Sequence, residues 1–593
     1  MTDKDAGNKP AGLKEQEPKM VNCTIDGFPV QVPEGTNILE AARKINIDIP
    51  TLCYLKDINV IGSCRLCLVT VNNSKVMQPA CVYQVTEGMT IETNTREIRR
   101  ARRINLELIL SDHDRKCLTC PRNQNCELQH LAEAFNISEI AYEGEYNKDP
   151  IDNLSPSIVR DPSKCILCRR CVSVCKNVQT VYAIDTMHRG FVTTVQCESG
   201  KSLAEVSCVK CGQCIISCPV GALREKDSTK AVWSALRDPD MHVVVQPAPA
   251  VRVGLGEEFG MPIGTRVTGK MVAALRRTGF DAVFDTDTGA DFTIMEEGTE
   301  FIHRLNGEGK LPQFTSCSPG WVKFCEEFYP EFMENISTAK SPHQMFGALI
   351  KTYYAQKKGL DPKKIFVVSL MPCTAKKYEA KRDEMITNGI PDVDAVITIR
   401  EFAKMIRELG IDFANLPDEE FDAPFGEASG AGAIFAATGG VMEAALRTVS
   451  EVLTGKPLDK IDFTDIRGTD GIKRSEVVIG DRTLRVAVVS GLGNARKLLD
   501  AIKSGEEAYD FVEFMACPGG CVNGGGQHIV SSKVHSTVDI KALRAKAVYE
   551  EDASLAVRKS HENPIVIQVY KEFLGEPCGH KSHELLHVDY LHR

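Results

Sequence analysis

The sequence predicts a multidomain protein of the α/β and α+β classes, in which small cysteine-rich modules precede a larger α/β domain. The chain has 593 residues, which is too long for one hydrophobic core. Most of its 23 cysteines lie before Ala231. Beyond Ala231, short apolar runs alternate with helical patterns, which is typical of an α/β domain.

The composition is that of an ordinary globular protein. Hydrophobic residues make up 43% of the chain and charged residues 25%. The net charge of −9 argues against nucleic acid or an anionic membrane as a partner. Residues 1–20 are polar and lack the apolar segment of a secretory signal, so we predict a disordered tail there. No run of about 18 or more apolar residues could span a bilayer, and we predict a cytoplasmic protein.

The spacing of the cysteines favours metal cofactors over disulfides. Many of the cysteines occur in C-x-x-C runs, which are too tight for the loops that disulfides close in secreted proteins. The sequence therefore indicates a reduced protein that binds metal clusters.

The first set of cysteines lies in a predicted 2Fe–2S ferredoxin-like domain over residues 21–98. From Met20 the sequence VNCTIDGFPVQV alternates apolar and polar residues, as in two strands joined by a turn at Gly27. One close pair of cysteines with two distant partners suits a 2Fe–2S cluster, whereas zinc sites more often use two close pairs. The predicted ligands are Cys53, Cys64, Cys67 and Cys81.

A second set follows in a helical segment that we assign to residues 99–139. One histidine and three cysteines stand in the spacing H-x3-C-x2-C-x5-C, which on chemistry alone binds zinc or a 4Fe–4S cluster equally well. Its place between other iron–sulfur motifs leads us to predict a 4Fe–4S cluster. The predicted ligands are His113, Cys117, Cys120 and Cys126.

Residues 140–230 contain two C-x2-C-x2-C-x3-C runs, the signature of a ferredoxin-like domain with two 4Fe–4S clusters. In that arrangement the fourth cysteine of each run ligates the other cluster. Pro219 follows the second run as the signature requires, whereas Lys176 replaces proline after the first. The predicted ligand sets are Cys165, Cys168, Cys171 and Cys218 for one cluster, and Cys208, Cys211, Cys214 and Cys175 for the other.

Isolated cysteines mark the larger domain, which we assign to residues 231–535. Cys317 follows the apolar run LPQFT, Cys373 follows KIFVVSLM, and Cys517 follows DFVEFM with Cys521 close behind. The carboxyl ends of strands form the active-site crevice of an α/β sheet. We therefore expect these four cysteines to converge on one place.

This carboxyl half resembles the catalytic domain of iron–iron hydrogenases. The segments TSCSPGW (315–321), MPCTAKKYE (371–379) and EFMACPGGCVNGGGQ (513–527) correspond to the three signature loops of that family. The resemblance covers essentially residues 21–593 and is to the long, multi-cluster members found in NAD(P)-linked or electron-bifurcating complexes. It implies ferredoxin-like iron–sulfur modules, an α/β iron-hydrogenase catalytic domain and, over residues 536–593, a region similar to the family's small subunit.

The resemblance implies reversible oxidation of dihydrogen to protons and electrons at a six-iron H-cluster. In that cofactor a cysteine thiolate joins a 4Fe–4S cubane to a two-iron centre that carries CO, cyanide and a bridging dithiolate. By resemblance Cys373, Cys517 and Cys521 are cubane ligands, and Cys521 is the bridge. The glycines around Cys521 are expected to let the backbone approach the cofactor closely.

The resemblance also assigns roles to residues around the cofactor. Lys376 is expected to donate a charge-assisted hydrogen bond to a cyanide. Met371 and Met515 are expected to pack beside the irons, with plain core packing as the alternative. Protons must leave a buried site through titratable groups. The family's relay positions match Glu297, Glu300 and Ser337, for which surface helix charge is the alternative interpretation of the two glutamates.

The first signature loop departs from the family pattern TSCCPxW. In that pattern the first cysteine passes protons and the second ligates the cubane. Here Cys317 stands at the relay position and Ser318 at the ligand position. Because a soft thiolate suits iron–sulfur clusters better than an alkoxide, we expect Cys317 to ligate the cubane, with ligation by Ser318 as the alternative.

The partners implied by the resemblance are ferredoxin, a flavin-containing subunit that reacts with NAD(P), or both, together with maturation proteins. No G-x-G-x-x-G follows a strand to open a dinucleotide-binding unit in this chain. The competing function is an iron–sulfur electron-transfer or assembly protein without hydrogenase activity. The complete cysteine sets and the signature loops argue against it.

Four cysteines fit none of these motifs. We expect Cys23, Cys197 and Cys325 to be core residues. Cys578 begins the histidine-rich tail CGHKSHELLHVDYLHR, which could bind a metal, although we expect a solvated terminal segment.

Overall fold

The computed structural model describes residues 18–145 and 147–590, so the predicted disordered tail lies almost wholly outside the described residues. The chain divides into two compact units. The first comprises Met1–Tyr54, Val60–Asp112 and Leu128–Glu145, and the second comprises Leu55–Asn59, His113–Glu127 and Tyr146–Arg593. None of the described helices combines the length and apolarity needed to cross a membrane.

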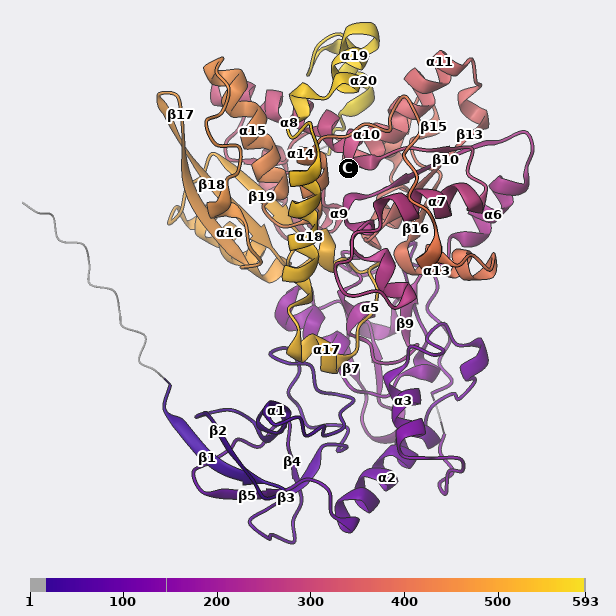
Figure 1. The fold of residues 1–593 in the computed structure, drawn as a ribbon, viewed down its shortest axis with the longest axis vertical. Helices are drawn as coiled ribbons and strands as arrows, with labels where there is room; N and C mark the ends of the chain where they lie inside the picture. Colours follow the sequence, from indigo (N-terminus) through magenta and orange to yellow (C-terminus); the bar gives the residue numbers. More distant parts are fainter. Residues whose placement is uncertain (1–17, 146, 591–593) are drawn as a thin grey trace, which may run out of the picture. The chain divides into compact units, whose positions relative to one another are not determined.

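The first unit is built on a five-stranded sheet with the strand order β2-β1-β5-β3-β4 (Figure 1). The predicted hairpin is confirmed, because β1 and β2 pair antiparallel through a turn in which Asp26 and Gly27 both have positive φ. Cys23 points into the core with Val21 and Ile25, as the alternation predicts. The elements of this unit are β1 (Met20–Ile25), β2 (Phe28–Pro33), α1 (Ile38–Lys44), β3 (Leu68–Val71), β4 (Gln78–Pro79), β5 (Met89–Glu92), α2 (Arg96–Ser111) and α3 (Glu127–Ala134).

The segment with the two long cysteine runs forms a small module within the second unit. Strand β6 (Ile158–Arg160) pairs antiparallel with β9 (Leu223–Glu225), and β7 (Asp185–Met187) with β8 (Thr194–Gln196). Each cysteine run leads into a short helix, α4 (Arg170–Ser173) for the first and α5 (Gln213–Ser217) for the second. The module is thus internally repetitive, as the repeated spacing predicts.

The larger domain contains two four-stranded sheets where the sequence led us to expect one crevice at a single sheet. One sheet is wholly parallel, in the order β11-β10-β13-β16. The other has the order β12-β19-β18-β17, with only β17 antiparallel to its neighbour. Their strands are β10 (His242–Pro247), β11 (Ala282–Val283), β12 (Gln313–Phe314), β13 (Ile365–Met371), β16 (Ala395–Thr398), β17 (Ile472–Ile479), β18 (Arg482–Ser490) and β19 (Phe511–Met515).

Helix α8 (Thr286–Leu305) connects the cores of the two sheets. Phe292 packs in the core of the first sheet, whereas Ile294 and Phe301 pack in that of the second. The helix is buried on nearly every side, and even Glu296 and Glu297 are inaccessible to solvent. A buried helix of this kind positions its polar side chains for internal roles. The other principal helices are α7 (Thr268–Thr278), α9 (Pro319–Phe328), α10 (Pro342–Leu349), α12 (Ala375–Glu379), α13 (Ile399–Glu408), α14 (Gly430–Ala433), α15 (Gly440–Thr454), α16 (Leu492–Ser504) and α18 (Ile540–Ser554).

The C-terminal segment is folded onto the larger domain, so the expectation of a solvated tail is wrong for the described residues. After α19 (Pro564–Val569) the chain forms α20 (His580–Leu586), whose Leu585 and Leu586 are buried in the first core. Backbone hydrogen bonds from Lys340 to Leu586 and from Val588 to Thr338 hold the end of the helix in place. The histidines and leucines of α20 form an amphipathic helix, which the polar composition of the tail did not indicate.

Candidate functional site

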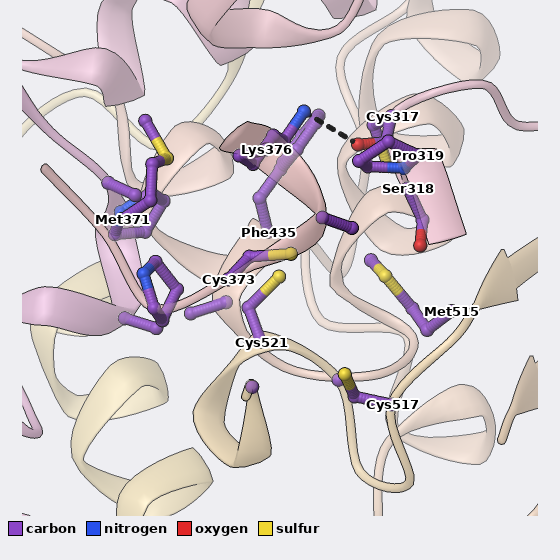
Figure 2. Close-up of a pocket in the computed structure, with 18 of the residues that line it drawn as sticks. Cys317, Ser318, Pro319, Met371, Cys373, Lys376, Phe435, Met515, Cys517 and Cys521 are labelled. Atoms are coloured by element: carbon purple, nitrogen blue, oxygen red, sulfur yellow. Dashed lines mark hydrogen bonds between the residues drawn. The ribbon is translucent and has the colours of Figure 1, made fainter. Parts of the chain in front are cut away.

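The carboxyl ends of β13 and β19 and the loop after β12 line a central cavity (Figure 2). The structure brings the four predicted cysteines to this one cavity, two strand ends coming from the second sheet and one from the first. The predicted residues that line it are Cys317, Ser318, Met371, Cys373, Lys376, Met515, Cys517 and Cys521.

Three of these thiols form a soft donor set that suits a metal cluster. The Cys373 and Cys521 sulfurs point toward one another, and Cys517 precedes Cys521 on the same loop (Figure 2). All three cysteines are free, and burial raises the pKa of Cys521 to about 12. Buried thiols that are gathered at one place and form no disulfide are suited to ligate iron as thiolates. The residues present therefore fit the iron–sulfur part of the cofactor that the sequence predicts.

The glycines around Cys521 also allow close packing of the protein backbone. A Cβ on Gly524 would stand 2.2 Å from the Pro372 carbonyl oxygen, and one on Gly525 would stand 2.5 Å from the Cys211 carbonyl oxygen. The missing side chains thus let this loop pack closely against neighbouring backbone, while Gly524 also lines the cavity. The consequence is a rigid frame for the cysteines at 517 and 521.

Lys376 is a buried cation that faces the cavity. Its ammonium donates to the Cys317 carbonyl oxygen at 3.1 Å and to the Glu379 carboxylate at 2.8 Å. Burial acts to raise the pKa of Glu379, but Lys376 and His343 outweigh it and hold that pKa at about 2. An ammonium has three donors, so one stays available to an anionic ligand in the cavity. The sequence analysis missed Glu379, although its place three residues after Lys376 on a helix is the signal for such a pair.

Cys317 and Ser318 turn toward different neighbours. The Ala516 N–H, next to Cys517, donates to the Ser318 hydroxyl at 3.2 Å. Burial raises the pKa of the Cys317 thiol most, Glu297 raises it further, and Lys376 lowers it. The serine hydroxyl is therefore tied to the loop of Cys517, whereas the thiol lines the same cavity within the electrostatic influence of Glu297.

Those carboxylates lie inside the molecule, which excludes the surface-charge interpretation for Glu297. Neither oxygen of this carboxyl has a hydrogen-bond partner among the described residues, and burial, with Glu300, raises its pKa to about 8. The Ser337 hydroxyl donates to Glu300 at 2.6 Å, and Arg304 forms an ion pair with Glu300 at 2.5 Å. The sequence analysis missed Arg304, which the four-residue helical spacing from Glu300 could have indicated.

The two long cysteine runs interleave as predicted from their spacing. Each crossed set lines its own small cavity, one of about 470 Å³ and one of about 380 Å³. The first cavity is lined by Cys165, Cys168, Cys171 and Cys218, and the second by Cys175, Cys208, Cys211 and Cys214. Cys211 also lines the central cavity, so the second set directly adjoins the functional site.

The remaining predicted sets are also gathered locally. In the first unit, the Cys53 thiol lies within hydrogen-bonding reach of Cys64 and Cys81, and Cys67 within reach of Cys81. In the second unit, the Nδ1 nitrogen of His113 is buried and has no hydrogen-bond partner in the described part of the chain. An unpartnered buried imidazole nitrogen is available to a metal.

The histidine-containing set adjoins the first crossed set. A Cβ on Gly221 would lie 2.6 Å from the Cys120 sulfur, so only glycine fits between the two sets. The Arg122 guanidinium donates to the Cys218 carbonyl oxygen at 3.1 Å. Within the second unit, three cysteine-rich sets therefore follow one another up to the central cavity.

Matches to known families cover most of the chain. Residues 241–525 match the C-terminal domain of the iron-only hydrogenase large subunit, and residues 538–593 match the iron hydrogenase small subunit. Residues 18–96 match a 2Fe–2S cluster-binding domain, and residues 102–141 match an iron–sulfur binding region of NADH–ubiquinone oxidoreductase G.

Similar proteins extend over nearly the full length. The chain is 51% identical over 589 residues to the NADP-reducing hydrogenase subunit HndD of Solidesulfovibrio fructosivorans, with 97% of this chain and 99% of that one aligned. It is 44% identical over 574 residues to iron hydrogenase 1 of Clostridium pasteurianum, covering 96% and 100%. A solved structure of apo FeFe-hydrogenase HydA1 from Chlamydomonas reinhardtii superimposes with a TM-score of 0.55 at 44% identity, covering 61% of this chain and 98% of that one. The chain therefore belongs to the iron–iron hydrogenase family and is an oxidoreductase that interconverts dihydrogen with protons and electrons, with an accessory iron–sulfur relay.

Proposed function

We propose that the central cavity holds the six-iron H-cluster on Cys373, Cys517 and Cys521, with Cys521 as the bridging thiolate. The observation that carries this proposal is the convergence of the three free thiols on one cavity. When bound, the two-iron centre supplies an open metal position that polarises dihydrogen for heterolytic cleavage. The chain holds this cofactor, excludes bulk water from it and carries protons away.

The neighbours of the cluster cysteines orient the cofactor. The free donor of Lys376 is aimed into the cavity and suits a cyanide ligand, while Glu379 keeps the ammonium in place. Met371 and Met515 end β13 and β19, are only 3% and 4% exposed, and line the same cavity. Polarizable thioethers at these positions pack against irons without competing for a proton.

For the fourth cubane position the contacts favour Ser318, which differs from the expectation based on thiolate softness. Its hydroxyl lies against the Ala516–Cys517 backbone, whereas Cys317 lies in the field of Glu297. We assign Ser318 to the cluster and Cys317 to the proton side. An oxygen ligand is harder than a thiolate, so this cubane is less tightly held than one with four cysteines.

The proton route continues along α8. From Cys317 it passes to Glu297, whose raised pKa keeps the carboxyl able to donate and accept a proton near neutral pH. The route continues through Ser337, whose hydroxyl donates to Glu300, and the guanidinium of Arg304 holds Glu300 in place through an ion pair. Each of these groups is held by a buried helix or by a hydrogen bond, so the route is fixed before the reaction begins.

Electrons leave through the cysteine-rich sets. We assign one 2Fe–2S cluster to the first unit and three accessory 4Fe–4S clusters to the second, in the ligand sets described above. The shared position of Cys211 supports direct transfer between the catalytic cluster and the second crossed set. We propose a reducing, cytoplasmic location, because thiols are kept reduced there and remain available as cluster ligands.

The metal content tests these assignments. Anaerobically matured protein is expected to contain roughly twenty irons per chain, from one 2Fe–2S, three 4Fe–4S and one six-iron cluster. It is also expected to show infrared bands of CO and cyanide. Iron analysis below about fourteen per chain, or a matured protein without those bands, would contradict the assignments. An iron–sulfur protein without hydrogenase activity would lack the bands altogether.

The electron carrier forms a separate prediction. The relative HndD is named as a subunit of an NADP-reducing hydrogenase, and this chain has no dinucleotide-binding motif of its own. We expect the purified chain to turn over hydrogen with an artificial dye or ferredoxin but not with NAD(P). Addition of a flavin-containing partner subunit is expected to restore NAD(P) reduction. Rapid NAD(P) reduction by the single chain would show that the interpretation is wrong.

A further inference from the structure

We infer that Glu296, Cys578 and His587 form a binding site for a single divalent transition-metal ion of the zinc class, separate from the H-cluster cavity. One ligand atom from each residue lies within 4.8 Å of those of the other two. A carboxylate, a thiol and an imidazole are the three ligand types that zinc takes in proteins. None of the three belongs to the cysteine sets or to the proton route described above.

The three residues come from separate parts of the chain and meet in the protein interior. Glu296 lies on α8 and is inaccessible to solvent, Cys578 precedes α20, and His587 follows it. The Cys578 N–H donates to the Glu296 carboxylate at 2.6 Å, and the same oxygen lies 3.0 Å from the His587 Nε2 nitrogen. The site therefore joins the C-terminal segment to the helix that carries the proton route.

Glu296 and His587 each have a hydrogen-bond partner that fixes the orientation of the side chain. The Tyr570 hydroxyl donates to the second oxygen of Glu296. The Thr338 hydroxyl lies 2.8 Å from the His587 Nδ1 nitrogen, and when Nδ1 donates that bond, Nε2 presents its lone pair toward Glu296. Hydrogen-bonded partners of this kind hold imidazole and carboxylate ligands in the orientation that a metal requires.

The backbone of Cys578 gives independent support. Its φ of 53° lies in the left-handed region, which a non-glycine residue rarely adopts. This conformation turns the Cys578 sulfur to within 3.4 Å of the Glu296 carbonyl oxygen instead of toward solvent. A strained residue that persists in a turn indicates a demand on where its side chain points.

A fourth, exchangeable ligand would be supplied by water. Three protein ligands and one water complete a tetrahedral zinc site. The ring of the exposed His583 stacks on His587 with centroids 4.4 Å apart and covers the site from the solvent side. A bound ion would thus crosslink the segment 578–587 to α8.

The experiment uses the full chain with its iron–sulfur clusters, kept anaerobic. Zinc is supplied in slight excess, unbound metal is removed by a chelator, and bound zinc is measured together with its X-ray absorption edge, which is distinct from that of iron. One zinc per chain is expected, with one sulfur neighbour at about 2.3 Å and nitrogen or oxygen neighbours at about 2.0–2.2 Å. Cys578→Ser and His587→Gln are each expected to weaken zinc binding by at least about 100-fold, because even loss of an outer partner costs about 10–100-fold.

Cys325→Ser is the matched control. Cys325 is another free, buried cysteine, and its thiol donates to the Tyr329 carbonyl oxygen, a bond that serine can keep. This control should bind zinc like the unaltered protein. No bound zinc in the unaltered protein, unchanged binding in Cys578→Ser, or a spectrum with three or four sulfur neighbours would overturn the proposal. If Cys578→Ser loses its iron or unfolds, Glu296→Gln and the spectrum of the unaltered protein decide, and neither depends on hydrogen turnover.

Discussion

Replacement of Glu297 by glutamine is expected to slow hydrogen turnover by about 10²–10⁴-fold while leaving the iron content and the infrared bands unchanged. The carboxyl is enclosed, has no hydrogen-bond partner among the described residues, and lies between the Cys317 thiol and the Ser337–Glu300 pair. Glutamine has the same shape but does not exchange a proton at neutral pH. The loss should therefore be one of proton transfer alone, measured with an artificial dye and by iron analysis of the same sample.

The pH dependence of stability gives a second readout for the same variant. Burial, and then Glu300, raises the pKa of Glu297 to about 8 from 4.5. The stability contribution of a raised carboxyl is fully present below its unfolded pKa and is lost as the pH rises through the folded pKa. The unaltered protein should thus lose more thermal stability than Glu297→Gln between about pH 5 and about pH 9. Thermal unfolding midpoints at the two pH values, compared within each protein, measure this difference.

Asp291→Asn provides the control for the measurement of hydrogen turnover. Asp291 is another buried carboxyl on α8, but it accepts hydrogen bonds from Ser429 and Asn563 and has no contact with the proton route. Its replacement should change stability without slowing the proton step. A Glu297→Gln protein that turns over hydrogen at the unaltered rate would remove this residue from the mechanism.

The pair at 317 and 318 carries the second large effect. Ser318→Ala is expected to lose the catalytic cubane and with it nearly all hydrogen turnover, because a methyl group cannot ligate iron. Cys317→Ala is expected to keep the cluster and to slow turnover by about 10²–10⁴-fold through the proton step. Electron paramagnetic resonance of the catalytic cluster in the two variants measures the difference. The accessory cluster signals of the same samples serve as the internal reference.

The opposite outcome has an equally definite meaning. If Cys317→Ala loses the catalytic signal and Ser318→Ala keeps it, the thiolate has taken the cubane position, as softness alone led us to expect. Ser318→Cys restores the usual family pair, and it should raise cluster occupancy and turnover under our assignment. A decrease in both would contradict the view that Ser318 stands at the ligand position.

The cluster-binding modules were the part of the fold most readily predicted from the sequence. Ligands separated by two or three residues are brought together by local backbone geometry, so the spacing of Cys165, Cys168 and Cys171 already describes one side of a site. The strands that end before Cys373 and Cys517 were also predicted from the sequence. The division of these strands between two sheets was not predicted, because strand pairing depends on contacts distant in sequence.

Other features of the site depend on such distant contacts. His343 forms a hydrogen bond with Glu379, which is 36 residues later in the chain, and no local sequence pattern predicts that pair. The expectation of a solvated C-terminal tail was also wrong. Most residues of the tail are polar, and the burial of Leu585 and Leu586 depends on core residues more than two hundred positions earlier. By contrast Arg304, four residues after Glu300, could have been found by helical spacing alone.

Gly525 of the larger domain packs closely against Cys211 of the module with the two long cysteine runs, so these two loops support each other. On the same seam, Gln179 donates to the Ala516 carbonyl oxygen at 2.9 Å and Gln213 to the Asn523 carbonyl oxygen at 2.8 Å, while Thr374 donates to Lys210 at 2.8 Å. Truncation before the larger domain would remove Gln179 and Gln213, the donors to the Ala516 and Asn523 carbonyl oxygens, and would remove the acceptor of the Thr374 hydroxyl. Engineering of a shortened enzyme from this chain therefore begins with redesign of that seam, before any change to the reaction centre itself.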